Sequence, residues 1–333
     1  MPRRSDFGEF RPTFRSGHGA GAGPSRRAYP HLVNDSKSGV GLGVAAYLCW
    51  GFFPLYWPLL DPASSLEILA HRFVWSMVFV LVSITAMGKW TTFIAIARDR
   101  RLMVILTFAS ITIALNWGGF IYGVTNGHVV ETSLGYFINP LVTVLLGVFV
   151  LKETLRPAQW GAIGIGVLAV VVLSIGYGRL PWIALLVAFS FAAYGFLKKK
   201  ANLGAFEGLG METAILFPVA VAFLVALQLR GDLTFGHEGP GNAALLVGTG
   251  VVTAIPLLLF GAAATRLTLT TIGILQYLGP VIQFITGLTI FDETMTTERW
   301  IGFVLVWIAL VIFTVDAITS RRRRMVPTEA API

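Results

Sequence analysis

The 333-residue sequence has little charge: Asp, Glu, Lys and Arg together make up only 13% of it. A soluble protein carries roughly 25% charged residues, because its surface must face water. Hydrophobic residues make up 55% of this chain, and its mean hydropathy is +0.75. Much of the surface must therefore face lipid, which excludes a large domain outside the membrane.

Cysteine and the common catalytic motifs are also missing. The single cysteine, Cys49, lies in an apolar stretch, which excludes a disulfide framework and Cys-based metal sites. The sequence has no G-x-x-x-x-G-K-[ST] loop, so it does not hydrolyse ATP by a P-loop mechanism. It also lacks H-E-x-x-H and G-x-S-x-G. We therefore expect no enzymatic activity, no metal and no cofactor.

Long apolar runs dominate what is present. Because lipid offers no hydrogen-bond partner to exposed backbone, each run is expected to be a helix. None of them alternates in the way a membrane barrel strand does. The predicted fold class is an all-α polytopic membrane protein. Its ten transmembrane helices are expected near residues 40–60, 65–87, 102–124, 131–151, 158–177, 181–198, 211–229, 243–265, 270–291 and 299–319.

Basic residues indicate the orientation of these helices. Of the 25 Lys and Arg residues, 21 fall in the two tails or in connections on one side of the membrane, so both termini are predicted to be cytosolic. Residues 1–37 and 321–333 are expected to be basic cytosolic tails, the first of them disordered. No apolar core of a cleaved signal peptide precedes the first span. The terminal basic run is expected to contact anionic lipid rather than nucleic acid.

The chain repeats itself at an offset of 140 residues. Pro140, the pair Glu153-Thr154 and Trp160 recur as Pro280, Glu293-Thr294 and Trp300. The predicted repeats cover residues 38–178 and 179–320, with five helices in each. Because five is odd, the second repeat must cross the membrane in the opposite sense. Inverted repeats are typical of secondary transporters that work by alternating access.

Several runs resemble the RarD branch of the EamA family, in the drug/metabolite transporter superfamily. These runs are AYLCWGFFPLYW at 46–57, EILAHR at 67–72, LNW at 115–117 and ETSLGYFINPL at 131–141, with shorter matches through 190–195 and 276–277. The resemblance covers about residues 38 to 320. It implies a bacterial inner-membrane carrier with two EamA repeats, named after a chloramphenicol-sensitivity phenotype that does not fix the natural substrate.

Three ionisable residues fall within the second predicted span. A charge there costs roughly 2.5 to 3.5 kcal/mol on insertion scales, which makes such residues functional candidates. Glu67, His71 and Trp75 share one helix face, whereas Arg72 lies about 100° round from His71. We predict substrate binding for His71 and Arg72, and proton coupling for Glu67 and His71. Alternatively, the side chains reach the outer interface or pair with a neighbouring helix. When Glu67 is aligned with Glu212, the second repeat has the apolar residues Leu216 and Phe217 where the first has His71 and Arg72. These ionisable residues then occur in the first repeat only.

Further substrate-binding candidates are polar or aromatic residues on spans that the resemblance places around a central cavity. Amide and phenol groups could orient a small amphipathic solute there, although such residues also bond helices together. Pro140 and Pro280 are candidate hinges, with packing kinks as the alternative. The substrate-binding candidates are Trp50, Asn116, Trp117, Tyr136, Asn139, Tyr194, Gln276, Tyr277 and, at the same level, Gln283.

The sequence therefore predicts a secondary transporter of small metabolites or drug-like molecules, with export as the expected direction. The alternatives are a channel and a non-transporting scaffold or sensor. Expected partners are the solute and membrane lipids, without nucleic acid, and a homodimer is compatible with the sequence. The natural substrate, proton coupling and oligomeric state cannot be read from the sequence.

One prediction concerns the ionisable residues of the second span. We expect His71→Ala and Arg72→Ala each to lower transport without preventing insertion, because a transport site has to hold the solute inside the membrane. The measurement is solute uptake in vesicles with equal amounts of inserted protein. Wild-type rates in both variants would remove these residues from the site.

Overall fold

The computed structural model describes residues 30–152 and 154–325, and every regular element in them is helical. Among these residues, ten helices are long and apolar enough to cross a membrane. The all-helical fold predicted from the sequence is therefore confirmed. The outlying parts of both predicted tails, residues 1–29 and 326–333, lie outside the described residues.

The ten spans are built from eleven helices, because the ninth span is divided into α10 and α11. A further helix, α3, and a short 3₁₀ turn, Trp57–Leu60, lie between spans, and another 3₁₀ turn, Phe53–Leu55, ends the first span. The helices are α1 (Pro30–Phe52), α2 (Ser65–Met87), α3 (Trp90–Arg98), α4 (Arg100–Thr125), α5 (Val129–Leu151), α6 (Pro157–Tyr177), α7 (Trp182–Ala201), α8 (Ala205–Arg230), α9 (Gly239–Ala264), α10 (Leu269–Leu275), α11 (Leu278–Thr289) and α12 (Thr297–Met325).

The helices extend into both predicted tails. Helix α1 already begins at Pro30, and α12 continues to Met325. Proline suits the first position of a helix, because the amide hydrogen it lacks would have no partner there. Helix α3 was not predicted. Its nine residues are too few to span a membrane, and it buries Phe93 and Ile96 against the bundle.

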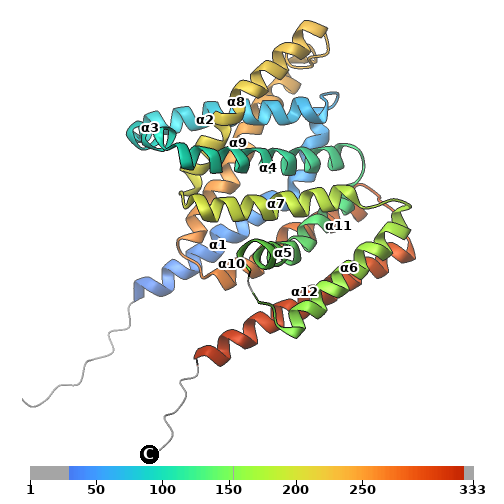
Figure 1. Cartoon of the computed structure of the whole chain (residues 1–333). Coiled ribbons are helices and arrows are strands. Elements are labelled where there is room, and N and C mark those ends of the chain that lie inside the picture. Colours follow the sequence, from blue (N-terminus) through green and yellow to red (C-terminus); the bar gives the residue numbers. More distant parts are fainter. Residues whose placement is uncertain (1–29, 153, 326–333) are drawn as a thin grey trace, which may run out of the picture.

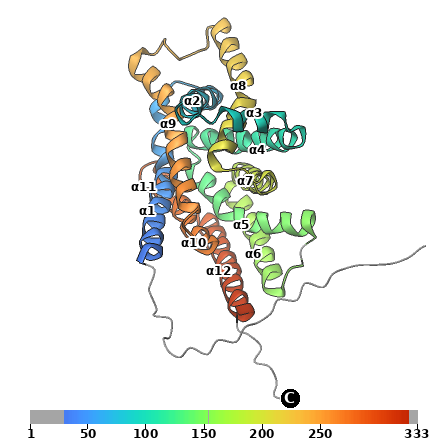
Figure 2. The same cartoon turned by 90° about the vertical axis from the view of Figure 1, so that its left-hand side faces the viewer.

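Helices of the first half pack mainly on helices of the second half. Helix α2 packs on α8, α5 on α11, and α6 on α12, and each of these pairs joins equivalent helices. The remaining large contacts come in matched sets: α4 with α7 corresponds to α9 with α1, and α5 with α7 corresponds to α11 with α1. Figures 1 and 2 show the two halves interlocked in this way. The pairing has the pseudo-twofold symmetry expected of two inverted repeats.

The helix starts correct one detail of the repeat alignment. Helices α2 and α8 begin at Ser65 and Ala205, so the 140-residue offset holds here too. Glu67 then corresponds to Glu207 rather than to Glu212, and Glu212 corresponds to Arg72. Both repeats therefore carry a buried ionisable residue at this position: Arg72 is 3% exposed and Glu212 is 2% exposed.

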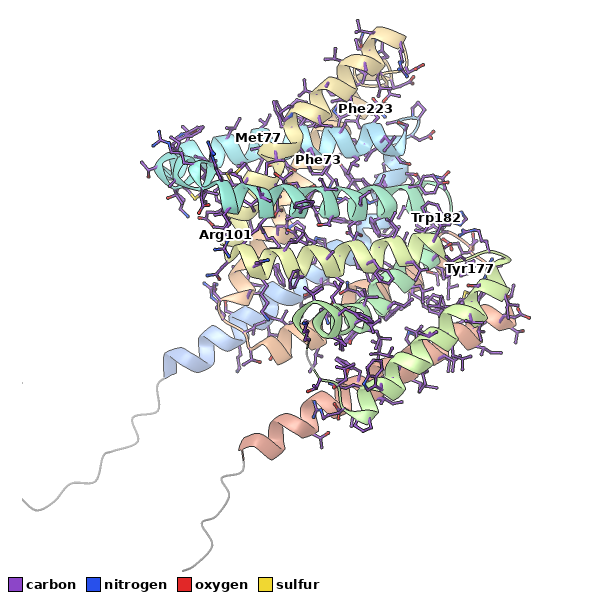
Figure 3. All side chains as sticks on the ribbon, in the orientation of Figure 1. Phe73, Met77, Arg101, Tyr177, Trp182 and Phe223 are labelled. Atoms are coloured by element: carbon purple, nitrogen blue, oxygen red, sulfur yellow. The ribbon has the colours of Figure 1, made fainter. Side chains whose placement is uncertain are left out.

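The two ends of the bundle can be told apart in Figure 3. Arg101 lies at one end, and Tyr177 and Trp182 lie at the other. Following the orientation predicted from the charges, we call the end with Arg101 the inner end and the opposite one the outer end. The start of α1 and the end of α12 both lie on the inner side, together with α3 (Figure 1).

Helices α2 and α9 approach each other closely at Gly250. A Cβ atom on this residue would lie 2.5 Å from the Trp75 carbonyl carbon and 2.6 Å from its oxygen, so the backbones could not stay in place. Only glycine permits this contact, which is characteristic of close helix packing in membranes.

We expect Gly250→Ala to destabilise the protein by about 1 to 3 kcal/mol, because the added methyl group must push α2 and α9 apart. Thermal unfolding in one detergent measures the effect. Gly241→Ala is the matched control on the same helix, since a Cβ there meets nothing within 4 Å. Equal melting temperatures for the two variants would contradict this account.

Candidate functional site

Arg72 lies on α2 and points into the interior of the bundle. Its Nε donates a hydrogen bond of 2.7 Å to Thr253 Oγ1 on α9. The Thr253 hydroxyl donates its own proton to the Thr249 carbonyl at 2.8 Å, so its oxygen is free to accept from Arg72. No carboxylate among the described residues lies within 4 Å of the Arg72 guanidinium.

Aromatic rings surround this guanidinium. Its central carbon lies 3.7 Å from the ring centre of Trp117, 5.3 Å from that of Trp57 and 5.7 Å from that of Phe53. A cation over aromatic faces gains roughly 0.5 to 2 kcal/mol, which offsets only part of the cost of burying a charge. Arg72 and the rings of Phe53, Trp57 and Trp117 are called the arginine cage below.

A chain of hydrogen bonds lies beside the arginine cage. The Tyr136 hydroxyl donates to Asn116 Oδ1 at 3.2 Å, and Asn116 Nδ2 donates to the Val187 carbonyl at 3.0 Å. Asn139 makes a similar bond to the Ala188 carbonyl. Both amides thus join the first repeat to α7. Four of the candidates from the sequence lie in this region, namely Arg72, Asn116, Trp117 and Tyr136. Asn139 bonds α5 to Ala188, which follows Val187 on α7.

Glu67 and His71 point away from the arginine cage. Glu67 Oε1 accepts from the Thr234 amide and hydroxyl at 2.9 and 2.7 Å, and from the Phe235 amide at 3.2 Å. Glu67 is only 1% exposed and fastens α2 to the connection before α9. It therefore pairs with a neighbouring segment and does not reach water.

His71 connects Glu67 with Trp75. The Trp75 indole can only donate, and it bonds to His71 Nδ1 at 3.2 Å. The proton of a neutral His71 is therefore on Nε2, which lies 3.8 Å from Glu67 Oε1. A second proton on Nδ1 would break the bond to Trp75.

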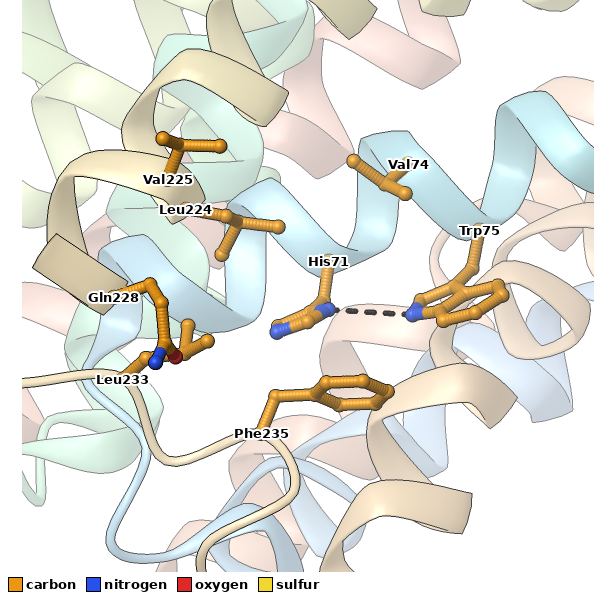
Figure 4. A pocket seen from close by; sticks show the side chains of 8 residues that line it. All are labelled: His71, Val74, Trp75, Leu224, Val225, Gln228, Leu233 and Phe235. Carbon is orange, nitrogen blue, oxygen red and sulfur yellow. Dashed lines mark hydrogen bonds between the residues drawn. The ribbon is translucent and has the colours of Figure 1, made fainter.

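A cavity of about 250 Å³ lies on this side of α2, and Figure 4 shows the side chains that line it. Its polar lining groups are His71 and Gln228, and the remaining residues are apolar. His71 and Arg72 therefore belong to two separate regions, as their 100° separation on the helix requires. The other lining residues are Val74, Trp75, Leu224, Val225, Leu233 and Phe235.

The remaining candidates from the sequence lie elsewhere. Trp50 forms an aromatic group with Tyr47 and Phe260, and its carbonyl accepts from Gln283 Nε2 at 3.0 Å. The Tyr194 hydroxyl donates to Glu212 Oε2 at 3.0 Å.

Gln276 and Tyr277 stand at the break between α10 and α11. Tyr277 packs against the core formed with α5 and α12. Pro140 lies inside α5 without interrupting it, and Pro280 lies in the first turn of α11 after the break.

Two buried carboxylates and one half-buried carboxylate were not selected from the sequence, although an acidic residue in or beside a span is itself a signal. Glu131 is bound at both oxygens by Arg179, at 3.2 and 2.8 Å. Glu212 pairs with Lys198 at 2.9 Å. The third is Glu293. Among the described residues, no group of three or more His, Cys, Asp or Glu side chains could hold a metal ion.

Glu293 lies between α11 and α12 and caps the first turn of α5. Both oxygens accept from the Val130 amide, at 3.3 and 3.1 Å, and Oε1 also accepts from the Val129 amide. Burial raises the pKa of Glu293 to about 7; the bonds to α5 and nearby Arg299 oppose this rise, and Glu131 adds to it. The contact joins the second repeat to the first at the outer end.

This architecture defines a class of protein: a multi-pass membrane protein of two five-helix halves with buried charge between them. The EamA-like transporter family model matches residues 37–175 and 180–315, and the chain belongs to this family. Within the family it is of the RarD type, and its function is that of a membrane transporter.

Individual relatives agree with this assignment. The chain is 51% identical to Protein RarD of Streptomyces exfoliatus over 90% of its length and 95% of the relative. It is 39% identical to Protein RarD of Escherichia coli strain K12, over 87% and 98%. It is also 39% identical to the uncharacterized transporter YojE of Bacillus subtilis, over 86% and 97%. One solved crystal structure, at 17% identity, shares the fold with a TM-score of 0.55, covering 85% of this chain and 99% of that one.

The Glu293 contact gives a pH prediction. The α5 amides favour the carboxylate, but burial outweighs them, so the position of Glu293 as a whole favours the protonated acid over a carboxyl in water, whose ordinary pKa is 4.5. The docking of Glu293 on α5 should therefore become less stable as pH rises from 4.5 through about 7. We expect the first amides of α5 to exchange hydrogen several-fold faster at about pH 8 than at about pH 6, after correction for the intrinsic rate.

The matched variants for this measurement are two Glu→Gln substitutions. Glu293→Gln should remove the pH dependence, because glutamine can still accept from the α5 amides and does not titrate. Glu298→Gln, at an exposed carboxylate in the first turn of α12, should leave it unchanged. If hydrogen exchange of these amides in the wild type did not depend on pH, Glu293 would not titrate in this range.

Proposed function

We propose that this transporter is a secondary carrier that moves small metabolites or drug-like molecules by alternating access of its two inverted repeats. The observation that carries the proposal is the symmetric pairing of helices between the halves. The polar contacts between the halves also differ between the outer and the inner end of the bundle. A carrier needs two conformations in which opposite ends are open, and inverted repeats supply both.

The outer end is joined by buried or partly buried hydrogen bonds between the halves. Glu293 caps α5, Glu67 holds the connection before α9, and the Tyr56 hydroxyl donates to the Leu245 carbonyl at 2.6 Å. Arg299 Nε donates to the Gly176 carbonyl at 3.2 Å. These bonds support a conformation that is closed at the outer end.

The ion pairs that join the halves at the inner end are more exposed. Lys89 pairs with Glu207 at 3.2 Å, and Arg156 pairs with Asp316 at 3.1 Å. The Lys89 and Arg156 side chains are 43% and 45% exposed, and exposed ion pairs contribute about 1 kcal/mol or less. Breaking these ion pairs therefore costs less than breaking the hydrogen bonds of the outer end, and another contact between the halves here is the apolar cluster around Val80, Phe93 and Leu209. Pro140 and Pro280, at equivalent positions, are the proposed hinges.

The remaining features of the proposal follow from the charges. The basic flanks favour an orientation with both termini in the cytosol. We propose the bacterial cytoplasmic membrane as the location and export as the direction. The pair Glu67 and His71 is the candidate for proton coupling, because a change in its protonation would alter the bonds to Trp75 and to the connection before α9. We propose the solute and lipids as partners, with a homodimer as a compatible assembly, and no enzymatic activity.

The test is counterflow in proteoliposomes, loaded with a panel of amino acids, organic acids and amphipathic drugs. We expect unlabelled solute inside to accelerate entry of the labelled solute, because a carrier returns faster when it is loaded. A channel would show flux without this acceleration. A pH gradient should alter the rate in the wild type and have no effect in His71→Ala.

Gly241→Ala, which has open space around the added methyl group, is the control for reconstitution. Flux that is equal with and without internal solute would favour the channel alternative. Absence of any solute-dependent flux with folded protein across this panel would contradict the proposal.

A further inference from the structure

We propose that the arginine cage binds the carboxylate of a monoanionic solute whose remaining part is apolar. This inference names the substrate class and rests on the proposed transport function. Its basis is the uncompensated charge of Arg72, because each of the other deeply buried charged groups described above has protein partners.

The charge balance inside the bundle sets Arg72 apart. Glu131 is neutralised by Arg179, and Glu212 by Lys198. Glu67 is held by hydrogen-bond donors of the connection before α9. Arg72 has rings and a hydroxyl around it but, within the described residues, no anion. A buried charge without a partner is strongly unfavourable, so an anion from outside the protein would be bound with a large gain.

The geometry limits where that anion can bind. One face of the guanidinium lies on Trp117, and Nε is engaged by Thr253. The two terminal nitrogens, Nη1 and Nη2, donate no hydrogen bond to any described residue. Together they form a fork that matches the two oxygens of a carboxylate in a bidentate pair.

The surroundings also limit what the anion carries. A single positive charge balances one negative charge, so a dianion would remain half uncompensated. An amino acid would bring an ammonium group, but Glu67, Glu131 and Glu212 already have partners, and no described carboxylate lies within 4 Å of Arg72. The rings of Phe53, Trp57 and Trp117 instead favour an apolar body. The class is therefore a monocarboxylate without an amino group.

The first test measures binding without transport, by thermal unfolding of the purified full chain in detergent. The probes are 3-phenylpropanoate and its primary amide, which differ in charge but hardly in shape. We expect the acid to raise the melting temperature with increasing concentration, and the amide to bind at least about tenfold more weakly. Phenylalanine, inorganic phosphate and chloride are expected to give smaller shifts than the acid. Equal shifts for acid and amide, or for acid and chloride, would overturn the proposal.

The second test uses variants. Arg72→Gln should lower the affinity for 3-phenylpropanoate at least about tenfold. Without ligand, its melting temperature should stay the same or rise, because an uncompensated buried charge has been removed. Arg101→Gln, at an exposed arginine on the inner end of α4, is the control and should bind like the wild type. A fall in the ligand-free melting temperature of Arg72→Gln, with no acid effect in the wild type, would make Arg72 a structural residue only.

Transport separates this inference from the function on which it rests. Counterflow of solutes that lack a carboxylate, at equal rates in wild type and Arg72→Gln, would overturn the inference while the carrier function stands. Arg72-dependent binding of 3-phenylpropanoate without any counterflow would support the site and overturn the carrier. Counterflow of monocarboxylates that is lost in Arg72→Gln would support both.

Discussion

The rest of this structure depends on one constraint: inside a bilayer, a polar group has no water to bond to and must find its partner in the protein or in a bound solute. The carboxylates of Glu67, Glu131 and Glu293 meet it by accepting from backbone amides of another segment, and Glu212 meets it through Lys198 and Tyr194. The bonds of Glu67, Glu131 and Glu293 also join the two halves at the outer end, whereas those of Glu212 join α7 and α8 within the second half. Hydrogen bonds and ion pairs of buried polar groups thus hold together helices whose apolar faces would pack equally well against lipid.

Much of the fold follows from patterns that are local in sequence. Length and apolarity predicted the spans, and helix geometry gave the 100° separation of His71 and Arg72, although both were predicted to bind substrate. The partners of these residues could not be predicted. Thr253 and Thr234 lie more than 150 residues from the α2 residues they bind, and only the packing of α2 against α9 brings them close. Nothing in a single sequence specifies which apolar face meets which.

Two further features could not be predicted from the sequence, for different reasons. Helix α3 and the ends of α1 and α12 lie outside the apolar runs, where a hydropathy argument has no signal. The register of α2 against α8 was assigned from one matching glutamate, and the helix starts show the other glutamate to be its equivalent. The predicted site residues divide in the same way: Arg72, Asn116, Trp117 and Tyr136 gather near the arginine cage, whereas Gln276 and Tyr277 flank a helix break and Trp50 and Tyr194 make separate contacts.

The equivalence of Arg72 and Glu212 bears on the energetics of the proposed cycle. Two identical inverted halves would make the outward-open and inward-open states images of each other, with equal free energy and equal occupancy. Here a cation among aromatic rings stands opposite a carboxylate paired with lysine, so exchanging the roles of the halves does not restore the same set of interactions. In the proposed cycle, the resting distribution between the two states is therefore expected to be unequal without any solute, so that the empty carrier would face one side of the membrane more often than the other.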